Sequence, residues 1–470
     1  GANIKMPVAV SPRFGFAYRF PKQSITMRGG VGIFSGRLPL AWPGGAYNNN
    51  GIFVAAFTAT LAQLNNIRFR PDPYQQWTPA SLNATINKEP LNLVAAKFSM
   101  PALARTSLAL DKKMNNGWRA GVELMFSKNL TEIKYTNINL LPPIGHAAGA
   151  DNRNVYSAVN NGKIPLNADG SNPFDYVILL GNNKIKTGYA YDLTTTVAGR
   201  LPKNWGLEMN YHFGKSTANN DGTSSINVSQ WRLMETVNGR NFLTRSVSDF
   251  SGGHKLFLLL NKTFQSPIKT IKTMISIVYT GQSGSPVSYV YGNNSMTRDD
   301  GIFGGYDLVY IPSIDDLAGM IFLPNIVNGI VYSSQQQKEM FENYMQNDHY
   351  LKTHRGSYAE RNGSRTPFTH IIDVKIKHTI RIKKNEMQLT VDFFNFSNFL
   401  HSSWGQRYYQ PNDNIALLDF AGYMTPNNLT PQYRFDPSLF FDKKWKSSTS
   451  TVPAYSASWS VQFGIRVILQ

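Results

Sequence analysis

The connections along this 470-residue chain alternate between short and long, and this pattern constrains the fold more than any other feature. Between them lie segments in which apolar and polar residues alternate strictly, as in 455–469, where Trp459, Phe463 and Ile465 share one side. Period two places each set on one face of a β-strand. We therefore predict eleven strands, over residues 9–20, 24–36, 104–114, 118–139, 185–201, 205–217, 254–265, 270–291, 366–382, 386–397 and 454–469.

Tight turns join these strands in pairs, and long connections separate the pairs. The turns are Pro21-Lys22-Gln23, Asn115-Asn116-Gly117, Pro202-Lys203-Asn204, Ser266-Pro267 and Lys384-Asn385, and Asn-Gly is a strong hairpin signal. The long connections, rich in Asn, Gly, Ser and Pro, are 37–103, 140–184, 218–253, 292–365 and 398–453. Such loops argue against a soluble domain but are expected on the outside of an outer-membrane barrel. We predict an all-β, antiparallel up-and-down transmembrane barrel in the outer membrane of a Gram-negative cell.

Composition agrees with this class. Charged residues make up only 16% of the chain and aromatic residues 13%, and no apolar run approaches the ~18 residues of a membrane helix. The chain has no cysteine, which excludes disulfide scaffolds, thiolate metal sites and cysteine nucleophiles.

The number of strands raises the question of how the barrel closes. Bacterial barrels have an even number of strands, and an open edge is not tolerated in lipid. The first predicted strand ends in a short turn and so runs toward the periplasm, as does the last. We therefore expect residues 1–470 to be the C-terminal portion of one larger barrel, with further strands on the N-terminal side.

Two segments within the long connections have patterns of their own. Residues 333–347 lack Gly and Pro and carry Met340, Phe341 and Tyr344 at helical spacing, which predicts a short packed helix. Residues 51–63 are apolar but too short to span a membrane, and we expect them to form packed loop core.

Several stretches resemble one family of proteins. They are Ser11-Pro12-Arg13-Phe14-Gly15-Phe16, Arg28-Gly29-Gly30-Val31-Gly32-Ile33-Phe34-Ser35-Gly36-Arg37, Gly281-Gln282-Ser283-Gly284-Ser285-Pro286-Val287-Ser288-Tyr289, Asp307-Leu308-Val309-Tyr310-Ile311-Pro312, His354-Arg355-Gly356, Ala359-Glu360-Arg361-Asn362-Gly363, Arg365-Thr366-Pro367-Phe368 and Asp392-Phe393-Phe394-Asn395-Phe396. In this order they resemble the C-terminal barrel region of TonB-dependent outer-membrane receptors, closest to the Oar-like branch of Bacteroidota, which carries an N-terminal carboxypeptidase-regulatory-like domain. The last residues, Ile468-Leu469-Gln470, depart from the aromatic ending common in outer-membrane strands.

The resemblance implies a 22-stranded barrel that is filled by an N-terminal plug and energised through a TonB box. Eleven strands would be half of such a barrel. The implied partners are a TonB-type energiser, acting through the N-terminal region, and outer-membrane lipids and lipopolysaccharide. Surface lipoproteins or other outer-membrane proteins are further candidate partners. No cofactor is implied.

Two sets of residues are candidates for function. The charges on the polar strand faces are predicted to line the lumen, where they would pair with a plug and guide a solute, although a solvated face without a specific role is the alternative. They are Arg13, Arg19, Arg28, Glu123, Asp192, Glu208, Asp373, Lys375, Lys377, Asp392 and Arg466. Aromatic residues near strand ends predict a belt at the lipid headgroups, with ligand stacking as the minority alternative. They are Trp118, Trp205, Tyr211, Trp404 and Trp459.

Other motifs give weaker signals. Asn219-Asn220-Asp221-Gly222-Thr223 and Asp299-Asp300-Gly301 have oxygen ligands for calcium, but both lack EF-hand spacing and are read as turns. Asp315-Asp316 is read as a solvated loop. The eight histidines show no zinc spacing, and no catalytic motif occurs, so we expect neither a metal site nor an enzyme.

The net charge of +18 is spread over turns, strands and loops, which does not favour nucleic acid as a partner. Attraction to anionic lipopolysaccharide or another polyanion competes here with general surface charge. Three functions then remain open: a TonB-dependent transporter for a large or scarce substrate, a scaffold barrel that holds partners with its loops, and an open diffusion porin. A soluble β-sandwich or propeller lectin is a remote alternative.

Overall fold

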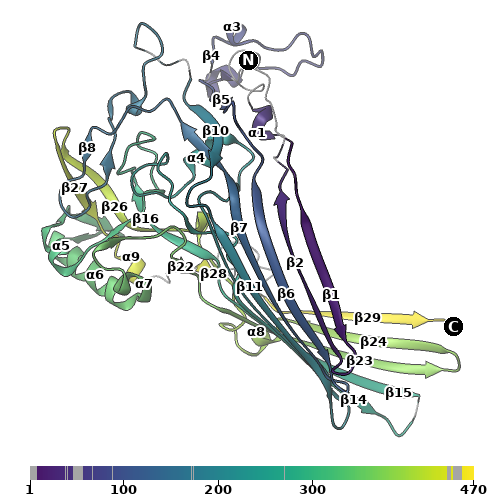
Figure 1. Ribbon diagram of the computed structural model, residues 1–470. Helices are drawn as coiled ribbons and strands as arrows, with labels where there is room; N and C mark the ends of the chain where they lie inside the picture. Colours follow the sequence, from purple (N-terminus) through teal and green to yellow (C-terminus); the bar gives the residue numbers. More distant parts are fainter. Residues whose placement is uncertain are drawn as a thin grey trace.

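The computed structural model describes residues 8–37, 39, 41–45, 57–65, 67–86, 88–170, 172, 174–268, 270–441, 446–447 and 458–469. Long strands form one curved, twisted sheet (Figure 1). Along its main path the strands are β1 (Arg13–Phe20), β2 (Ile25–Ser35), β6 (Ala102–Lys113), β7 (Arg119–Asn137), β11 (Tyr189–Leu201), β12 (Trp205–Ala218), β14 (Gly253–Gln265), β15 (Ile271–Gln282), β23 (Thr369–Ile382), β24 (Asn385–Phe394) and β29 (Ser460–Ile468).

Each strand on this path pairs antiparallel with its neighbours, in chain order. The prediction of an antiparallel up-and-down all-β fold is therefore confirmed. Each of the eleven predicted strands has a counterpart on the path. The last strand was predicted from residue 454, but 454–457 lie outside the described residues. Within the described part of the chain, β1 pairs only with β2 and β29 only with β24, so both edges of the sheet are open.

The predicted strand 270–291 is wrong, because the chain leaves the sheet in the middle of it. β15 ends at Gln282, and β16 (Pro286–Asn293) belongs to a different sheet. Proline lacks the N–H that a ladder needs, so Pro286 cannot continue a central strand. Gly284 lies so close to Thr366 that a Cβ atom there would overlap it. The Gly-Ser-Pro sequence thus marks the exit from the main sheet.

The long connections fold into a compact body beside one end of the sheet, which we call the loop cap and define as residues 286–365 and 414–435 (Figure 1). Its five-stranded sheet has the order β18 (Ile321–Phe322), β27 (Asn428–Arg434), β26 (Asn414–Thr425), β16 and β22 (Ser364–Arg365). The helices α5 (Ile314–Gly319), α6 (Ser334–Asn347) and α7 (His349–Thr353) pack around it. Tyr289, Phe341 and Phe435 are among its fully buried core side chains.

The helix predicted over 333–347 is confirmed as α6. Its N-cap Ser333 accepts a hydrogen bond from the Gln336 backbone, and the Gln336 side chain accepts one from the Ser333 backbone in return. Phe341 and Tyr344 are buried as the spacing predicted. Asp315 and Asp316, read as a solvated loop, instead form the first turn of α5, where Ser313 and Asp316 make a second capping box. This local capping pattern, with an acid in the first turn, fits a helix start.

A smaller apolar cluster lies where β10 (Val177–Asn183) pairs with β5 (Leu91–Val94) and with the long-connection end of β7. It contains Trp42, Tyr135 and Trp231, the last on α4 (Asn227–Arg232). Part of the apolar segment 51–63 falls on 51–56, which are outside the described residues, and the rest forms β3 (Phe57–Thr58) and part of α2 (Leu61–Leu64). β7 is 19 residues long, more than a bilayer needs.

The remaining elements are short, and none of the described helices is long and apolar enough to cross a membrane. They are α1 (Ala41–Gly44), α3 (Pro79–Leu82), β4 (Thr85–Ile86), β8 (Gly145–His146), β9 (Asn154–Val155), η1 (Val159–Gly162), β13 (Ser246–Val247), β17 (Tyr310–Ile311), β19 (Asn325–Val327), β20 (Ile330–Tyr332), β21 (Ser357–Tyr358), α8 (Phe396–Leu400), β25 (Tyr408–Tyr409), η2 (Pro411–Asp413), α9 (Ser438–Phe441) and β28 (Lys446–Ser447).

Candidate functional site

One face of the main sheet carries the charges that the sequence analysis singled out. The strand register puts all of them on the same side, because residues paired across neighbouring strands share a face. They are Arg13, Arg19, Arg28, Glu123, Asp192, Glu208, Asp373, Lys375, Lys377, Asp392 and Arg466. We call this side the polar face. That it lines a barrel lumen stays a prediction.

Ion pairs bridge neighbouring strands on the polar face. Arg28 on β2 lies 3.0 Å from the Asp111 carboxylate on β6 and 2.8 Å from that of Glu123 on β7. Lys375 and Asp392, on β23 and β24, are 2.7 Å apart. Most of these side chains keep substantial exposure, as in the 49% of Arg28, whereas Asp392 is 18% exposed. Exposed ion pairs contribute little to the stability of a fold. These pairs are therefore of interest because they leave charged groups on an open surface.

The other predicted charges have weaker or different partners. His212 lies 3.6 Å from Asp192, and Arg119 lies 3.9 Å from Glu208. The Asp373 carboxylate accepts a 2.7 Å hydrogen bond from the Asn395 backbone. The Arg13 guanidinium stacks on the Phe34 ring at 4.4 Å. In the described part of the chain, four of the predicted cations lie within 4.0 Å of no carboxylate, namely Arg13, Arg19, Lys377 and Arg466.

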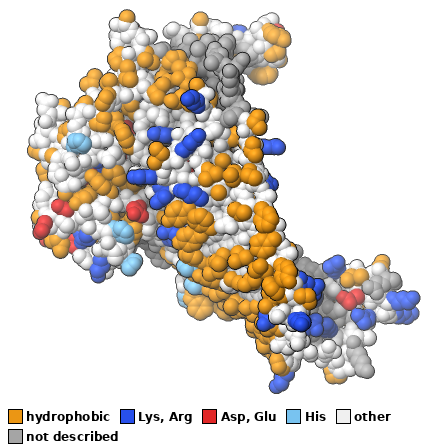
Figure 2. Space-filling view, viewed as in Figure 1, with side chains coloured by type: hydrophobic (Ala, Val, Ile, Leu, Met, Phe, Trp, Pro, Cys, Tyr) orange, Lys and Arg blue, Asp and Glu red, His pale blue; other side chains and the backbone are white. Residues whose placement is uncertain are grey.

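The opposite face is apolar and holds most of the predicted belt aromatics. On it, Leu124, Phe126 and Ile277 remain substantially exposed, and Figure 2 shows hydrophobic side chains gathered over the strands. Trp118 and Trp205 lie by the short turns, and the Lys262 ammonium sits 5.1 Å from the Trp205 ring. Tyr211 and Trp459 lie toward the long connections, and Trp459 packs edge-on against Phe399. Trp404 lies on the loop after α8, against His401. The aromatics thus divide between two ends of the apolar face.

Sequence reasoning missed two tyrosine–histidine pairs on this apolar face. The Tyr211 hydroxyl lies 2.7 Å from Nδ1 of His254, and the Tyr279 hydroxyl lies 2.7 Å from Nδ1 of His370. Both pairs lie where the strands meet the long connections. A signal was present, since each histidine begins a strand face that continues with three aliphatic residues.

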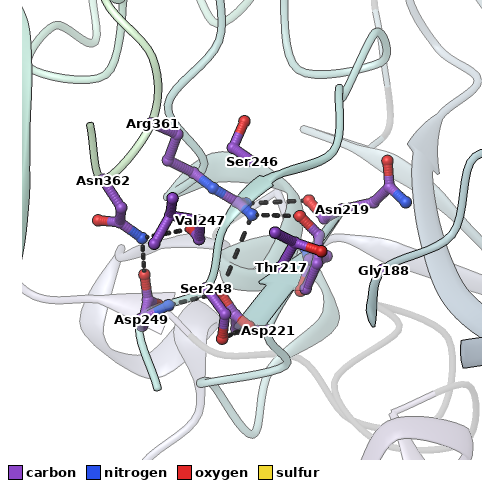
Figure 3. Close-up of polar contacts among 12 residues, drawn as sticks. Gly188, Thr217, Asn219, Asp221, Ser246, Val247, Ser248, Asp249, Arg361 and Asn362 are labelled. Carbon is purple, nitrogen blue, oxygen red and sulfur yellow. Dashed lines mark hydrogen bonds and ion pairs between the residues drawn. The ribbon is translucent and has the colours of Figure 1, made fainter. Parts of the chain in front are cut away.

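A clamp of polar residues ties the loop cap to the main sheet, and Figure 3 shows it. The Arg361 guanidinium donates to the carbonyls of Ala218 at 2.7 Å and Asn219 at 2.9 Å, and lies 3.9 Å from the Asp221 carboxylate. The next residue, Asn362, donates through its side chain to the Val247 carbonyl at 2.9 Å. The motif Ala359-Glu360-Arg361-Asn362-Gly363 therefore anchors one long connection to the end of β12.

The acidic turns that had calcium-like composition are occupied by protein donors. The Asp221 carboxylate accepts from the Ser248 hydroxyl at 2.5 Å and the Asp249 backbone at 3.0 Å, and burial raises its pKa above the ordinary value. Asp299 pairs with Arg240, both fully buried. Asp300 lies 2.6 Å from Arg232 and accepts from Tyr176 at 2.7 Å. Across the described residues, no group of three or more His, Asp or Glu side chains could hold a metal ion.

One carboxyl in this region has an unusual pKa. Glu235 lies just after α4, and its side chain is half-buried. Burial raises the pKa of Glu235 to about 7, while the Arg361 charge opposes this rise. The carboxyl therefore titrates near neutral pH, close to the clamp.

A family model with the description outer membrane beta barrel domain matches residues 7–416. The chain belongs to this family. Its membership places this barrel chain in the outer membrane, as predicted. The region matched includes the main sheet as far as β24 and most of the loop cap.

Among solved structures, the barrel chain is similar to a mutant of the ferric enterobactin receptor of Pseudomonas aeruginosa, with 9% identity and a TM-score of 0.34 over 82% of this chain and 34% of that one. It is also similar to the F3-3 variant of the FrpB iron transporter of Neisseria meningitidis, with 9% identity and a TM-score of 0.30 over 82% and 38%. The F5-1 variant of the same transporter is 10% identical, with a TM-score of 0.27 over 82% of this chain and 40% of that one. The chain thus spans less than half of each solved protein. A search among curated proteins finds no match.

Proposed function

We propose that this chain is the C-terminal barrel portion of a TonB-dependent transporter of the Oar-like branch, which moves a large or scarce substrate across the outer membrane. The observation that carries the proposal is the open sheet. Its described edge strands, β1 and β29, do not pair with each other, and both expose apolar side chains such as Phe14 and Phe463. Since lipid does not tolerate an open edge, further strands would have to close this barrel.

The two faces of the sheet suit this role. The apolar face would meet lipid, and the polar face would surround a plug and a passing solute. Charged side chains such as Arg28 and Lys375 are exposed and could pair with a plug. Their present ion pairs contribute little stability, so replacing them with pairs to a plug would cost little free energy. The energiser, a TonB-type protein, would act on a segment that precedes residue 1. Displacement of the plug would open the path, and the long connections would capture the substrate.

The first test is the intact mass and N-terminal sequence of the protein from detergent-extracted outer membrane. Several hundred further residues with a plug and a TonB box would support the proposal. If Gly1 is the native start, another chain must complete the barrel, and the proposal fails. In planar bilayers, we expect the complete protein to stay closed without its energiser. A steady open conductance would favour a porin instead.

A second function, a scaffold barrel, is favoured by the surface of the loop cap. Ile314, Ile326 and Val331 on the cap are 70%, 69% and 62% exposed, although the cap has a packed core of its own. Exposed apolar groups of this kind suit a protein partner such as a surface lipoprotein. Deletion of the energiser separates the two functions: uptake would stop for a transporter, whereas partner retention by the loops would be unchanged for a scaffold.

A further inference from the structure

A cavity of about 310 Å³ opens on the loop cap, between α5, the strands β18 and β27, and the turn that joins β8 to β9. Figure 1 shows α5 and β27 on the side of the cap that is away from the main sheet. Backbone contacts hold these walls together, since β18 pairs with β27 and the Ala148 N–H donates to the Leu429 carbonyl at 2.9 Å. Small-molecule sites begin at roughly 300 Å³, so this cavity suits one chemical group with its stem and not a whole large substrate.

Part of the cavity wall is apolar and aromatic. Tyr310, Pro431 and Tyr433 are buried, and the half-buried Met320 and Ile321 lie beside them in the lining. An aliphatic stem that entered the cavity would lose its contact with water against these side chains. The faces of aromatic rings also attract cations. This wall therefore suits a ligand that joins an aliphatic stem to a positive charge.

Three carboxylates line the cavity, whereas none of the described residues that line it is a lysine, arginine or histidine. The charge of Asp151 is balanced by the buried Arg153, which lies 2.8 Å away. Asp315 and Asp316 lie within 4.0 Å of no cation in the described part of the chain. Lys338 on α6 comes near, but it donates to a backbone carbonyl of α5 at 2.8 Å and does not line the cavity. The cavity is thus negatively charged, in a chain whose net charge is +18.

The two aspartates of α5 have different structural roles. Asp316 completes the capping box of the helix, and its Oδ2 accepts from the Ser313 hydroxyl at 2.7 Å and from the Tyr310 hydroxyl at 2.9 Å. The hydrogen bond from Ser313 lowers the pKa of Asp316, so this carboxyl is ionised at neutral pH. The Asp315 carboxylate is exposed and makes neither a hydrogen bond nor an ion pair with the residues that the structure describes. Asp315 is therefore available to a ligand.

We propose that this cavity binds an ammonium or guanidinium group on an aliphatic stem, as in a lysine or arginine side chain of a polypeptide. The cation would form a charge-assisted hydrogen bond with Asp315, and the charge of Asp316 would add to the attraction. The stem would pack against Met320 and the two tyrosine rings. A metal ion is a poorer fit, because no group of three or more His, Asp or Glu among the described residues could hold one. The site goes beyond the proposed transport function, since it does not depend on how the barrel closes.

The test uses the complete protein in mild detergent and measures dissociation constants by saturation-transfer NMR. The probes are N-acetyl-arginine amide and N-acetyl-citrulline amide, which have nearly the same shape but differ in charge. We expect the neutral citrulline probe to bind about tenfold more weakly, because it cannot make a charge-assisted pair. A third probe, 1,5-diaminopentane, identifies the source of the cation. Tighter binding of the diamine than of the arginine probe would point to free amines, and the reverse order would point to polypeptides.

Two variants and one control locate the binding. Asp315→Asn removes a charge and leaves the capping box intact, because that box uses Asp316, and we expect it to weaken the arginine probe about tenfold. A Cβ atom at Gly319 would meet no other atom within 4 Å, so Gly319→Leu should fold, fill the cavity and weaken both amide probes. The control is Glu339→Gln, at an exposed acid on α6 that does not line the cavity, and it should bind both probes as the unchanged protein does.

Three results would overturn the proposal. Equal binding of the arginine and citrulline probes would mean that the cavity does not recognise a positive charge. Equal weakening of the arginine probe by D315N and E339Q would mean that the general charge of the cap attracts it. Binding that neither D315N nor G319L changes would place the probe elsewhere on the protein. None of these results depends on transport, so a failure here is distinct from a failure of the proposed function.

Discussion

The Arg361 guanidinium lies 2.7 Å from the Ala218 carbonyl, and this contact joins the connection before β23 to the last residue of β12. The two residues are 143 positions apart in the chain. The side chain of Arg361 is only 2% exposed, so this contact is shielded from water. It holds the loop cap against the sheet at the long-connection end of β12.

We expect Arg361→Met to lower the free energy of unfolding of the loop cap by about 3–5 kcal/mol, because it strands the buried Asp221 charge and two carbonyls. The measurement is urea-induced loss of protease resistance in the long connections. The control is Arg407→Met, which changes an exposed arginine. Equal sensitivity in the two variants would show that the clamp does not hold the cap.

Arginine–carboxylate ion pairs on the polar face should contribute much less stability than the buried Arg361 contacts. Arg28→Gln breaks two ion pairs whose members are 38–49% exposed, so we expect a loss of no more than about 1 kcal/mol. Urea unfolding of the detergent-solubilised protein checks this. A loss as large as that of the Arg361 variant would mean that the polar face is sealed from water by a plug.

The stability of the region around Glu235, which lies beside the loop cap, should fall as the pH rises from about 4.5 to 7. In the fold, burial raises the pKa of Glu235 to about 7, above its ordinary value, so the folded state binds its proton more tightly than the unfolded state does. Stability from this group is present at low pH and is lost between about pH 4.5 and 7. We expect Glu235→Gln to remove about 1–3 kcal/mol of the difference between pH 5 and pH 8. Glu339→Gln, at an exposed acid on α6, should leave the difference unchanged.

The core of the cap depends on α6. Phe341 is 0% exposed and packs against Phe322 and Phe435, so Phe341→Ala should cost the cap about 3–5 kcal/mol. Gln335→Ala on the exposed side of the same helix should cost less than about 0.5 kcal/mol. The measurement is the temperature at which a protease begins to cleave the cap in each of the two variants. If the cap resisted cleavage equally in both, its stability would come from the sheet instead.

The sequence predicted local structure well where one rule governed it. Strict alternation placed Leu207 and Glu208 on opposite faces, because side chains on a strand point alternately to each side. The absence of Gly and Pro, with the helical spacing of Phe341 and Tyr344, predicted α6 with its start within one residue of the observed one. The split of 270–291 was missed because β16 is rich in valine and tyrosine and so also has the composition of a strand, although the Pro286 and Gly284 breakers were visible in the sequence.

The sequence by itself therefore determined the class of fold, the strand order and the two chemically distinct faces. Each of these follows from local periodicity and connection length. Only the tertiary structure decided that Arg361 reaches Ala218, that Lys128 and Arg245 share the Thr187 carbonyl, and that two tyrosine–histidine pairs meet on the apolar face. These contacts join residues far apart in the chain, and their partners are chosen by strand register and loop packing, which no local pattern encodes.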